Sequence, residues 1–263
     1  MAFNIFKRKE EPIILDCYTA SSHAYNYAKV DYSRKYIPEW WRVHPNESEG
    51  FATIKHCTAF TDYYAKGIVI PLWGEVEITV HPLGQQEDTF CWRSSNEHFN
   101  LHEHNHSKAQ WQGFGNDNMF NIKIVSPWAL KTRDTVYFSW SQPIWSQPDT
   151  FSGLTSFPAV MQFKTQTATH INYVLEQKAE QQVFTLPPLT PLAMLHPMTE
   201  RKVELRHHLV NENTMSCILN GSRSMFLDSN FPQIFNAGKG KGLGAKKKAF
   251  WKKSDELNKC PFK

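Results

Sequence analysis

The stretch Gly67-Ile-Val-Ile-Pro-Leu-Trp-Gly-Glu-Val-Glu-Ile-Thr-Val80 decides the fold class of this protein. In each half every second residue is apolar: first Ile68, Ile70 and Leu72, then Val76, Ile78 and Val80. Successive side chains of a β-strand point to opposite faces. The alternation therefore predicts two strands that each bury one face.

Short runs with a strand-like pattern recur along the chain, at residues 12–17, 121–125, 135–140, 159–164, 169–176, 182–186, 192–195 and 202–209. Turn-forming clusters separate them, among them Pro82-Leu83-Gly84 and Ser146-Gln147-Pro148-Asp149. Many short strands joined by such turns are typical of a β-sandwich or jelly roll rather than of βαβ units. The sequence therefore predicts a mainly β fold, a jelly-roll-like β-sandwich.

Helices are expected near both ends of the chain. Residues 21–36 predict an N-terminal helical segment that Ser22 would cap and that Pro38 would follow. Residues 211–219 predict a short helix that ends at Asn220-Gly221. Residues 246–257 predict a second short C-terminal helix that forms when the segment is docked.

Charge and composition divide the chain into three parts. Residues 1–11 form a charged start that we expect to be flexible, and residues 12–236 form a single β-rich domain. Residues 237–263 form a basic Lys/Gly-rich tail with nine Lys against Asp255 and Glu256, a net charge of +7. Because the whole chain carries +4, the residues before the tail carry −3. The basic character of the protein belongs to its tail.

The totals exclude several classes of protein. Of the 263 residues 41% are hydrophobic and 14% aromatic, too many for an intrinsically disordered chain. Lys7-Arg8-Lys9 interrupts any N-terminal signal region, and no apolar run approaches the roughly 20 residues that span a bilayer. Five cysteines without a Cys-x-x-Cys pair indicate free thiols in a reducing compartment. We therefore expect a soluble, cytoplasmic protein with no membrane partner.

A histidine-rich segment, His98-Phe-Asn-Leu-His102-Glu-His104-Asn-His106, is the most distinctive polar cluster. If it is extended, His102, His104 and His106 lie on one face and could hold a divalent transition metal such as Zn²⁺, Fe²⁺ or Ni²⁺. A His-x-His pair on a jelly-roll strand resembles the start of a cupin metal site. The downstream Glu and the Gly spacing of cupins are missing, however, and no His-x-Asp pair follows. A solvated polar loop is the alternative.

Aromatic residues and the tail are the candidate binding sites. Most of the nine Trp are expected to fill the interface between sheets, but Trp40 and Trp41 are adjacent, and adjacent residues do not both enter a core easily. In the tail, Lys246, Lys247 and Lys248 precede Trp251, and a flexible, basic, aromatic-ended segment is suited to contact with nucleic acid. It could equally dock on an acidic protein surface.

Five segments together resemble a known family: Tyr36-Ile-Pro-Glu-Trp-Trp-Arg, Thr53-Ile-Lys-His-Cys, Gly67-Ile-Val-Ile-Pro-Leu-Trp, Val125-Ser-Pro-Trp-Ala-Leu-Lys-Thr and Leu192-Ala-Met-Leu-His-Pro-Met-Thr-Glu-Arg. Their order is similar to an uncharacterised family of T4-like tailed phages of marine cyanobacteria. It is more distantly similar to a bacterial domain-of-unknown-function family. The resemblance covers about residues 12–210 and implies a viral protein located in the host cytoplasm or in the virion. It carries no catalytic residue.

The sequence leaves open whether the protein is an enzyme. It lacks the Gly-x-Ser-x-Gly, Walker, dinucleotide-binding and His-Glu-x-x-His patterns. The first hypothesis is a non-catalytic phage accessory or virion-associated binding module with a phage or host protein as partner. The alternative is a metal-dependent enzyme of the cupin or Fe(II)/2-oxoglutarate oxygenase type, with His102 and His104 as ligands.

Overall fold

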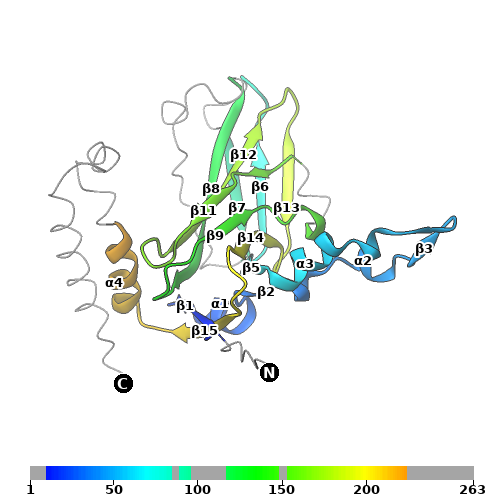
Figure 1. Ribbon diagram of the computed structural model, residues 1–263. Helices are drawn as coiled ribbons and strands as arrows, with labels where there is room; N and C mark the ends of the chain where they lie inside the picture. The colour runs from blue at the N-terminus through cyan, green and yellow to red at the C-terminus, as the bar shows by residue number, and fades with distance from the viewer. Residues whose placement is uncertain (1–9, 85–88, 96–116, 148–152, 224–263) are drawn as a thin grey trace, which may run out of the picture.

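The computed structural model describes residues 10–84, 89–95, 117–147 and 153–223, and of residues 221–223 only the backbone (Figure 1). These residues form a mainly β structure with four sheets, as the sequence predicts. The first sheet has five strands, in the order β10 (Thr155–Ser156), β12 (Ala168–Glu176), β8 (Met119–Lys131), β1 (Ile13–Thr19) and β15 (Val203–Leu209). Its pairs are antiparallel except β1 with β15, which run parallel with Ile13 opposite Val203.

The other three sheets are antiparallel throughout. The second has the order β11 (Ala159–Met161), β9 (Phe138–Ser141), β14 (Pro191–Pro197), β5 (Ile68–Pro71) and β2 (Asp31–Tyr32). The third has the order β13 (Gln182–Leu186), β6 (Val76–Val80) and β7 (Phe90–Ser94). The fourth is a small hairpin of β3 (Glu47–Ser48) and β4 (Phe51–Ala52).

Two chain segments connect the second sheet with the third, and each bends where it passes between them. β5 leads into β6 and β13 into β14, while β5 pairs with β14 and β6 with β13. At the bend, the Leu72 N–H donates to the Thr190 carbonyl over 2.8 Å and the Leu189 N–H donates to the Leu72 carbonyl over 2.8 Å. These two bonds keep the bent segments paired between the sheets. We call this place the strand bend.

The main core lies between the first sheet and the second and third sheets. The apolar alternation read from the sequence is the buried face of β6, where Val76, Ile78 and Val80 are fully buried. The residues that pack against this face come from other strands of the three larger sheets, including strands in which buried and less buried side chains alternate in the same way. The buried Tyr173 hydroxyl of β12 donates to the Leu192 carbonyl of β14 over 2.7 Å, so it links the first sheet to the second.

The predicted N-terminal helix is wrong in length. α1 (Ser22–Tyr27) has only six residues and is capped by Ser21, whose side chain accepts from the Ala24 N–H, rather than by Ser22. The chain then extends into β2, which pairs with β5, and turns through the 3₁₀ helix η1 (Ser33–Tyr36). Pairing with β5 satisfies the backbone of Asp31 and Tyr32, which explains why these two residues do not continue the helix.

At the other end, α4 (Glu212–Arg223) is longer than predicted. Asn211 caps it by accepting from the Thr214 N–H over 2.8 Å, and Gly221 lies inside the helix instead of ending it. The predicted helix over residues 246–257 lies outside the described residues. The jelly roll is not confirmed, because jelly-roll strands are antiparallel and β1 pairs with β15 in parallel.

Candidate functional site

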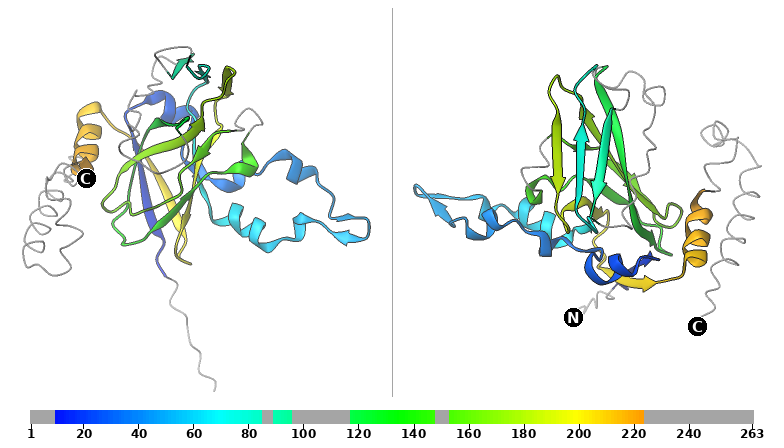
Figure 2. Two further views of the ribbon diagram at one scale, coloured as in Figure 1. Left: turned by 90° about the horizontal axis from the view of Figure 1, so that it is seen from above. Right: turned by 180° about the vertical axis from the view of Figure 1, so that it is seen from behind.

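An arm projects from the β-sheets beyond the edge of the second sheet formed by β2 (Figures 1 and 2). We define it as residues 38–57, which comprise α2 (Glu39–Val43), the β3–β4 hairpin and the 3₁₀ helix η2 (Ile54–His56). α3 (Thr58–Lys66) brings the chain back to the sheet, and the sequence analysis missed this helix.

The tip of the arm is a tight hairpin. Ser48 pairs with Phe51, so the loop has two residues, Glu49 and Gly50, with φ of 52° and 80°. A two-residue loop with positive φ at both positions is a type I′ turn, which matches the twist of the flanking strands. The Thr53 N–H donates to the Asn46 carbonyl over 3.0 Å and continues the pairing toward the base. The arm therefore has a defined backbone of its own.

Aromatic rings join the base of the arm to the body, with Phe60 of α3 at the centre. Phe60 is 7% exposed, and its ring lies 5.5 Å from that of Trp41, 5.8 Å from that of Trp40 and 5.8 Å from that of Trp145. Trp145 comes from η4 (Ile144–Ser146), about a hundred residues away along the chain. We call Trp40, Trp41, Phe60, Tyr64 and Trp145 the aromatic cluster.

The two tryptophans singled out from the sequence have different environments. Trp41 stacks on Phe60 and carries the Lys55 ammonium 5.6 Å from its ring centroid, so it packs inward. Trp40 is 40% exposed, and its indole N–H donates to the Trp145 carbonyl over 3.3 Å. Trp145 is 45% exposed. The outer face of the cluster is therefore a pair of half-exposed indoles, of which the sequence analysis singled out one.

Hydrogen bonds anchor α3 beneath this cluster. The Ser33 hydroxyl donates to the Tyr64 carbonyl over 2.7 Å, and the Ser146 hydroxyl donates to the Tyr36 carbonyl over 2.6 Å. Because Ser146 has a single proton, its bond with the Tyr64 hydroxyl must be donated by Tyr64. Burial raises the pKa of Tyr64 to about 12, which keeps that donor protonated at neutral pH.

A histidine completes the anchor on the other side of α3. The ring of His196 on β14 lies 4.7 Å from that of Tyr63, and its Nε2 lies 2.8 Å from the Tyr63 carbonyl. A carbonyl oxygen only accepts, so Nε2 carries the proton. Burial lowers the pKa of His196 and favours the neutral ring. The contacts of His196 and Tyr64 serve to hold the arm, which is a structural role.

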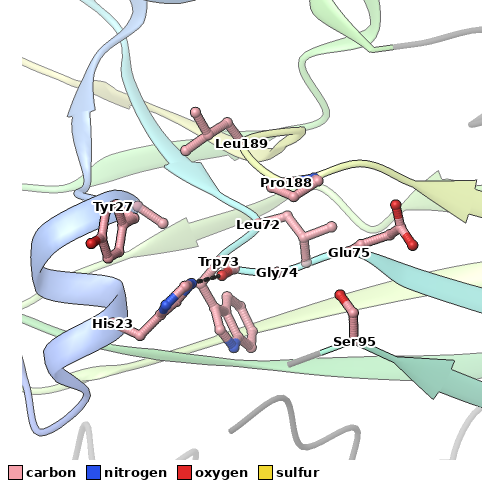
Figure 3. Close-up of a pocket in the computed structure, with 10 residues that line it drawn as sticks. His23, Tyr27, Leu72, Trp73, Gly74, Glu75, Ser95, Pro188 and Leu189 are labelled. Atoms are coloured by element: carbon pink, nitrogen blue, oxygen red, sulfur yellow. Dashed lines mark hydrogen bonds between the residues drawn. The ribbon is translucent and has the colours of Figure 1, made fainter. Parts of the chain in front are cut away.

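A second feature, an open pocket of about 590 Å³, lies at the strand bend (Figure 3). Its floor is Leu72 and Trp73, which follow β5. Tyr27 of α1 stands on one side, 70% exposed, and Leu189 on the other, 48% exposed. The segments that meet here are distant in sequence, which explains why the sequence analysis missed the pocket.

Polar groups lie along the same pocket. The Glu75 carboxylate and the Ser95 hydroxyl are exposed on its far side from α1 (Figure 3). Nε2 of His23 lies 2.8 Å from the Trp73 carbonyl, so the proton of the neutral ring sits on Nε2 and leaves Nδ1 as an acceptor. The pocket thus combines apolar side walls with hydrogen-bond acceptors.

The remaining predicted site residues are not placed. His102, His104 and His106 lie in residues 96–116, and Lys246, Lys247, Lys248 and Trp251 lie in residues 224–263, both outside the described residues. Within the part of the chain that the structure describes, no three His, Cys, Asp or Glu side chains form a group that could hold a metal ion. The metal site and the nucleic-acid contact therefore stay predictions.

The described residues also show the environment of four cysteines. Cys17 is buried, and burial, with Asp16 and Asp31 nearby, raises the pKa of its thiol. Cys57, Cys91 and Cys217 are exposed free thiols. No helix over the described ranges is both long and apolar enough to cross a membrane.

Comparison with known proteins assigns no family: no protein-family model, no curated protein and no solved structure matches the chain.

Proposed function

We propose that the protein is a non-catalytic binding module that docks on a partner protein through its arm. The observation that carries this proposal is the exposure of large apolar side chains on a projecting element (Figure 2). Phe51 is 75% exposed at the tip, Val43 71% exposed on α2, and Trp40 40% exposed at the base. All three lie within residues 38–57, and large apolar side chains exposed together on one element mark interaction sites on soluble proteins where they form a patch.

The chemistry of the arm favours a protein as the partner. Trp and Phe are among the side chains that contribute most to protein interfaces, because one ring buries much area at a small entropic cost. Glu47 and Glu49 are exposed beside Phe51 at the tip. A complementary surface would therefore offer apolar depressions for the rings and basic side chains around them.

The arm is prepared for binding before a partner arrives. Its type I′ turn, its paired strands and the bond from the Lys55 ammonium to the Arg42 carbonyl, 2.8 Å long, fix the backbone in the free protein. A preorganised element loses less conformational entropy on association. Because the backbone of the arm is already ordered, we expect the arm to dock on its partner as a rigid surface.

The biological setting is part of the proposal. The resemblance of residues 12–210 to the phage family supports an accessory or virion-associated protein of a tailed phage, acting in the host cytoplasm or in the particle. The alternative, a metal-dependent oxygenase, rests on the histidine-rich segment, and no contact among the described residues favours it.

A site-specific crosslinking experiment tests the arm directly. A photo-crosslinking amino acid replaces Phe51 in one variant and Val160 in a second, matched variant. Val160 is 57% exposed on β11, the opposite edge strand of the second sheet from β2. In lysate of infected cells we expect one defined protein adduct from position 51 and none from position 160.

Additional variants make the result specific. Trp40→Ala with Trp145→Ala removes the outer indoles and should abolish the adduct formed from position 51. Equal labelling from positions 51 and 160, or an adduct insensitive to loss of both indoles, contradicts docking through the arm. Absence of the protein from virions and from every complex of the infected cell contradicts the binding module itself.

A further inference from the structure

The turn that forms one side of the pocket holds a leucine in an unfavourable backbone conformation. The Thr190 N–H donates to the Pro187 carbonyl over 3.2 Å, so residues 187–190 form a β-turn with Pro188 and Leu189 at its centre. Leu189 has φ of 66°. Proline followed by a residue of positive φ is the pattern of a type II turn, whose third position strongly favours glycine because a Cβ is strained there.

The strain places an apolar side chain where it gains little from folding. Leu189 is 48% exposed and lies on the rim of the pocket (Figure 3). A bulky residue at positive φ costs about 1–3 kcal/mol, and such strain gathers at sites that bind ligands. Glycine would suit the turn better, but it would remove this side of the pocket. The retained side chain is accounted for if it contacts a ligand.

The opposite side is an exposed aromatic ring. Tyr27 is 70% exposed at the end of α1, and its ring lies 5.1 Å from that of His23. His23 is itself fixed by its bond to the Trp73 carbonyl. Figure 3 shows Tyr27 on the α1 side of the pocket and Leu189 beside Pro188, so that each offers the pocket an apolar surface.

The polar groups decide the charge of the ligand. Glu75 presents a carboxylate to the pocket, and the tautomer of His23 that donates from Nε2 to the Trp73 carbonyl offers Nδ1 as an acceptor. The Ser95 hydroxyl both donates and accepts. Among the described residues that line the pocket there is neither Lys nor Arg, so an anion such as a phosphate would meet the carboxylate of Glu75 with no basic side chain beside it. A ligand that suits these groups carries several hydroxyl donors and no negative charge.

We propose that the pocket at the strand bend binds an uncharged saccharide. A sugar ring has an apolar C–H face that stacks on an aromatic ring and a rim of hydroxyls that donate to carboxylates and imidazoles. The pocket offers Tyr27 for the first and Glu75, Ser95 and His23 for the second. Its volume of about 590 Å³ lies within the range of small-ligand sites. This site is separate from the arm and does not depend on docking through it.

Ligand-detected NMR with the full-length protein tests the proposal. The probes are a panel of methyl glycosides of neutral hexoses, with tetramethylammonium and inorganic phosphate as charged probes. We expect at least one glycoside to bind and neither charged probe to compete with it. Binding of no glycoside overturns the proposal, and tetramethylammonium binding in its place identifies the pocket as a cation site.

Three variants tie binding to the pocket. Tyr27→Ala removes an exposed ring and should weaken glycoside binding about fivefold to tenfold, and Glu75→Gln should weaken it about tenfold. Trp40→Ala in the arm should leave the affinity unchanged. An affinity that tolerates both pocket variants overturns the proposal.

Leu189→Gly separates ligand binding from folding. We expect it to weaken glycoside binding while the melting temperature stays the same or rises by about 2–4 °C, because glycine relieves the strained turn. Leu83→Gly is the matched control, since Leu83 is 47% exposed and has no positive φ. It should lower the melting temperature by about 1–4 °C. The role given to Leu189 is overturned if both variants lower the melting temperature equally. It is also overturned if Leu189→Gly binds the glycoside as well as the unchanged protein does.

Discussion

Gly67 joins α3 to β5, and adding one methyl group there should destabilise the fold. Gly67 follows α3 directly and precedes β5. Its φ of −77° is one that any residue adopts, so it is space and not backbone freedom that requires glycine. A Cβ at this position would lie 2.6 Å from Ser33 Oγ, 2.9 Å from Met194 Sδ and 2.9 Å from the Tyr63 carbonyl oxygen. Carbon atoms do not approach other heavy atoms so closely without displacing them.

The magnitude follows from what must move. The Tyr63 carbonyl belongs to the last turn of α3 and cannot shift alone, so Gly67→Ala should carry the usual cost of overpacking, about 1–3 kcal/mol. Displacing the Ser33 hydroxyl would also break its 2.7 Å bond to the Tyr64 carbonyl, which costs about 1 kcal/mol. We expect the free energy of unfolding to fall by about 2–4 kcal/mol in total.

Equilibrium unfolding in urea, followed by tryptophan fluorescence and far-ultraviolet circular dichroism, measures this loss. A double-mutant cycle with Ser33→Ala tests the cause. Ser33→Ala removes the nearest contact, so the loss in the double variant should be smaller than the sum of the two single losses by about 1 kcal/mol. Ala65→Ser, at an exposed position of α3, should change stability by less than about 0.5 kcal/mol. A Gly67→Ala loss below about 0.5 kcal/mol, or strictly additive losses, would refute the argument.

Three further predictions concern side chains buried in or between the β-sheets. Tyr173→Phe should lower the free energy of unfolding by about 1–2 kcal/mol in urea denaturation, because it leaves the buried Leu192 carbonyl without the hydroxyl that now donates to it; an unchanged midpoint would contradict this. Burial lowers the pKa of His196 and His207 in the folded protein. Below about pH 6.5 the unfolded chain therefore binds more protons than the folded one, and the free energy of unfolding should decrease as the pH is lowered. Replacing both with Gln should flatten that slope between pH 7.5 and about 5.5, and an identical slope would speak against the assignment. Iodoacetamide should label the exposed thiols of the native protein but spare Cys17 until urea is added, as peptide mass spectrometry would show; rapid native labelling of Cys17 would disprove its burial.

Sequence reasoning predicted the parts of the fold whose signal is local. Alternation of apolar residues identified β6 and β12, because a strand with one buried face must repeat with period two. It missed β7, whose residues from Phe90 to Ser94 include no fully buried side chain and which, within the described ranges, pairs with β6 alone. Such a strand is specified by its neighbour. It also missed α3, although Phe60 and Tyr64 lie one helical turn apart and are both buried.

The candidate sites likewise divide into those that have a local sequence signal and those that have none. The argument that two adjacent tryptophans do not both enter a core led to Trp40 and Trp41 together; the structure leaves the indole of Trp40 40% exposed and stacks that of Trp41 on Phe60. Trp145 carried no comparable signal, since it meets Trp40 only after η4 packs against α2. The pocket gave no signal either, because Tyr27, Glu75 and Leu189 come from three separate segments.

The sequence by itself determined that this is a mainly β protein with a large aromatic core, because composition and period-two patterning act within a few residues. Only the tertiary structure decided that β1 pairs in parallel with β15, that residues 38–57 form an arm, and that Leu189 adopts positive φ. Each of these depends on contacts between distant segments. The stability of such a contact depends on residues that become neighbours only in the folded protein, so the local pattern of residues contains little sign of it.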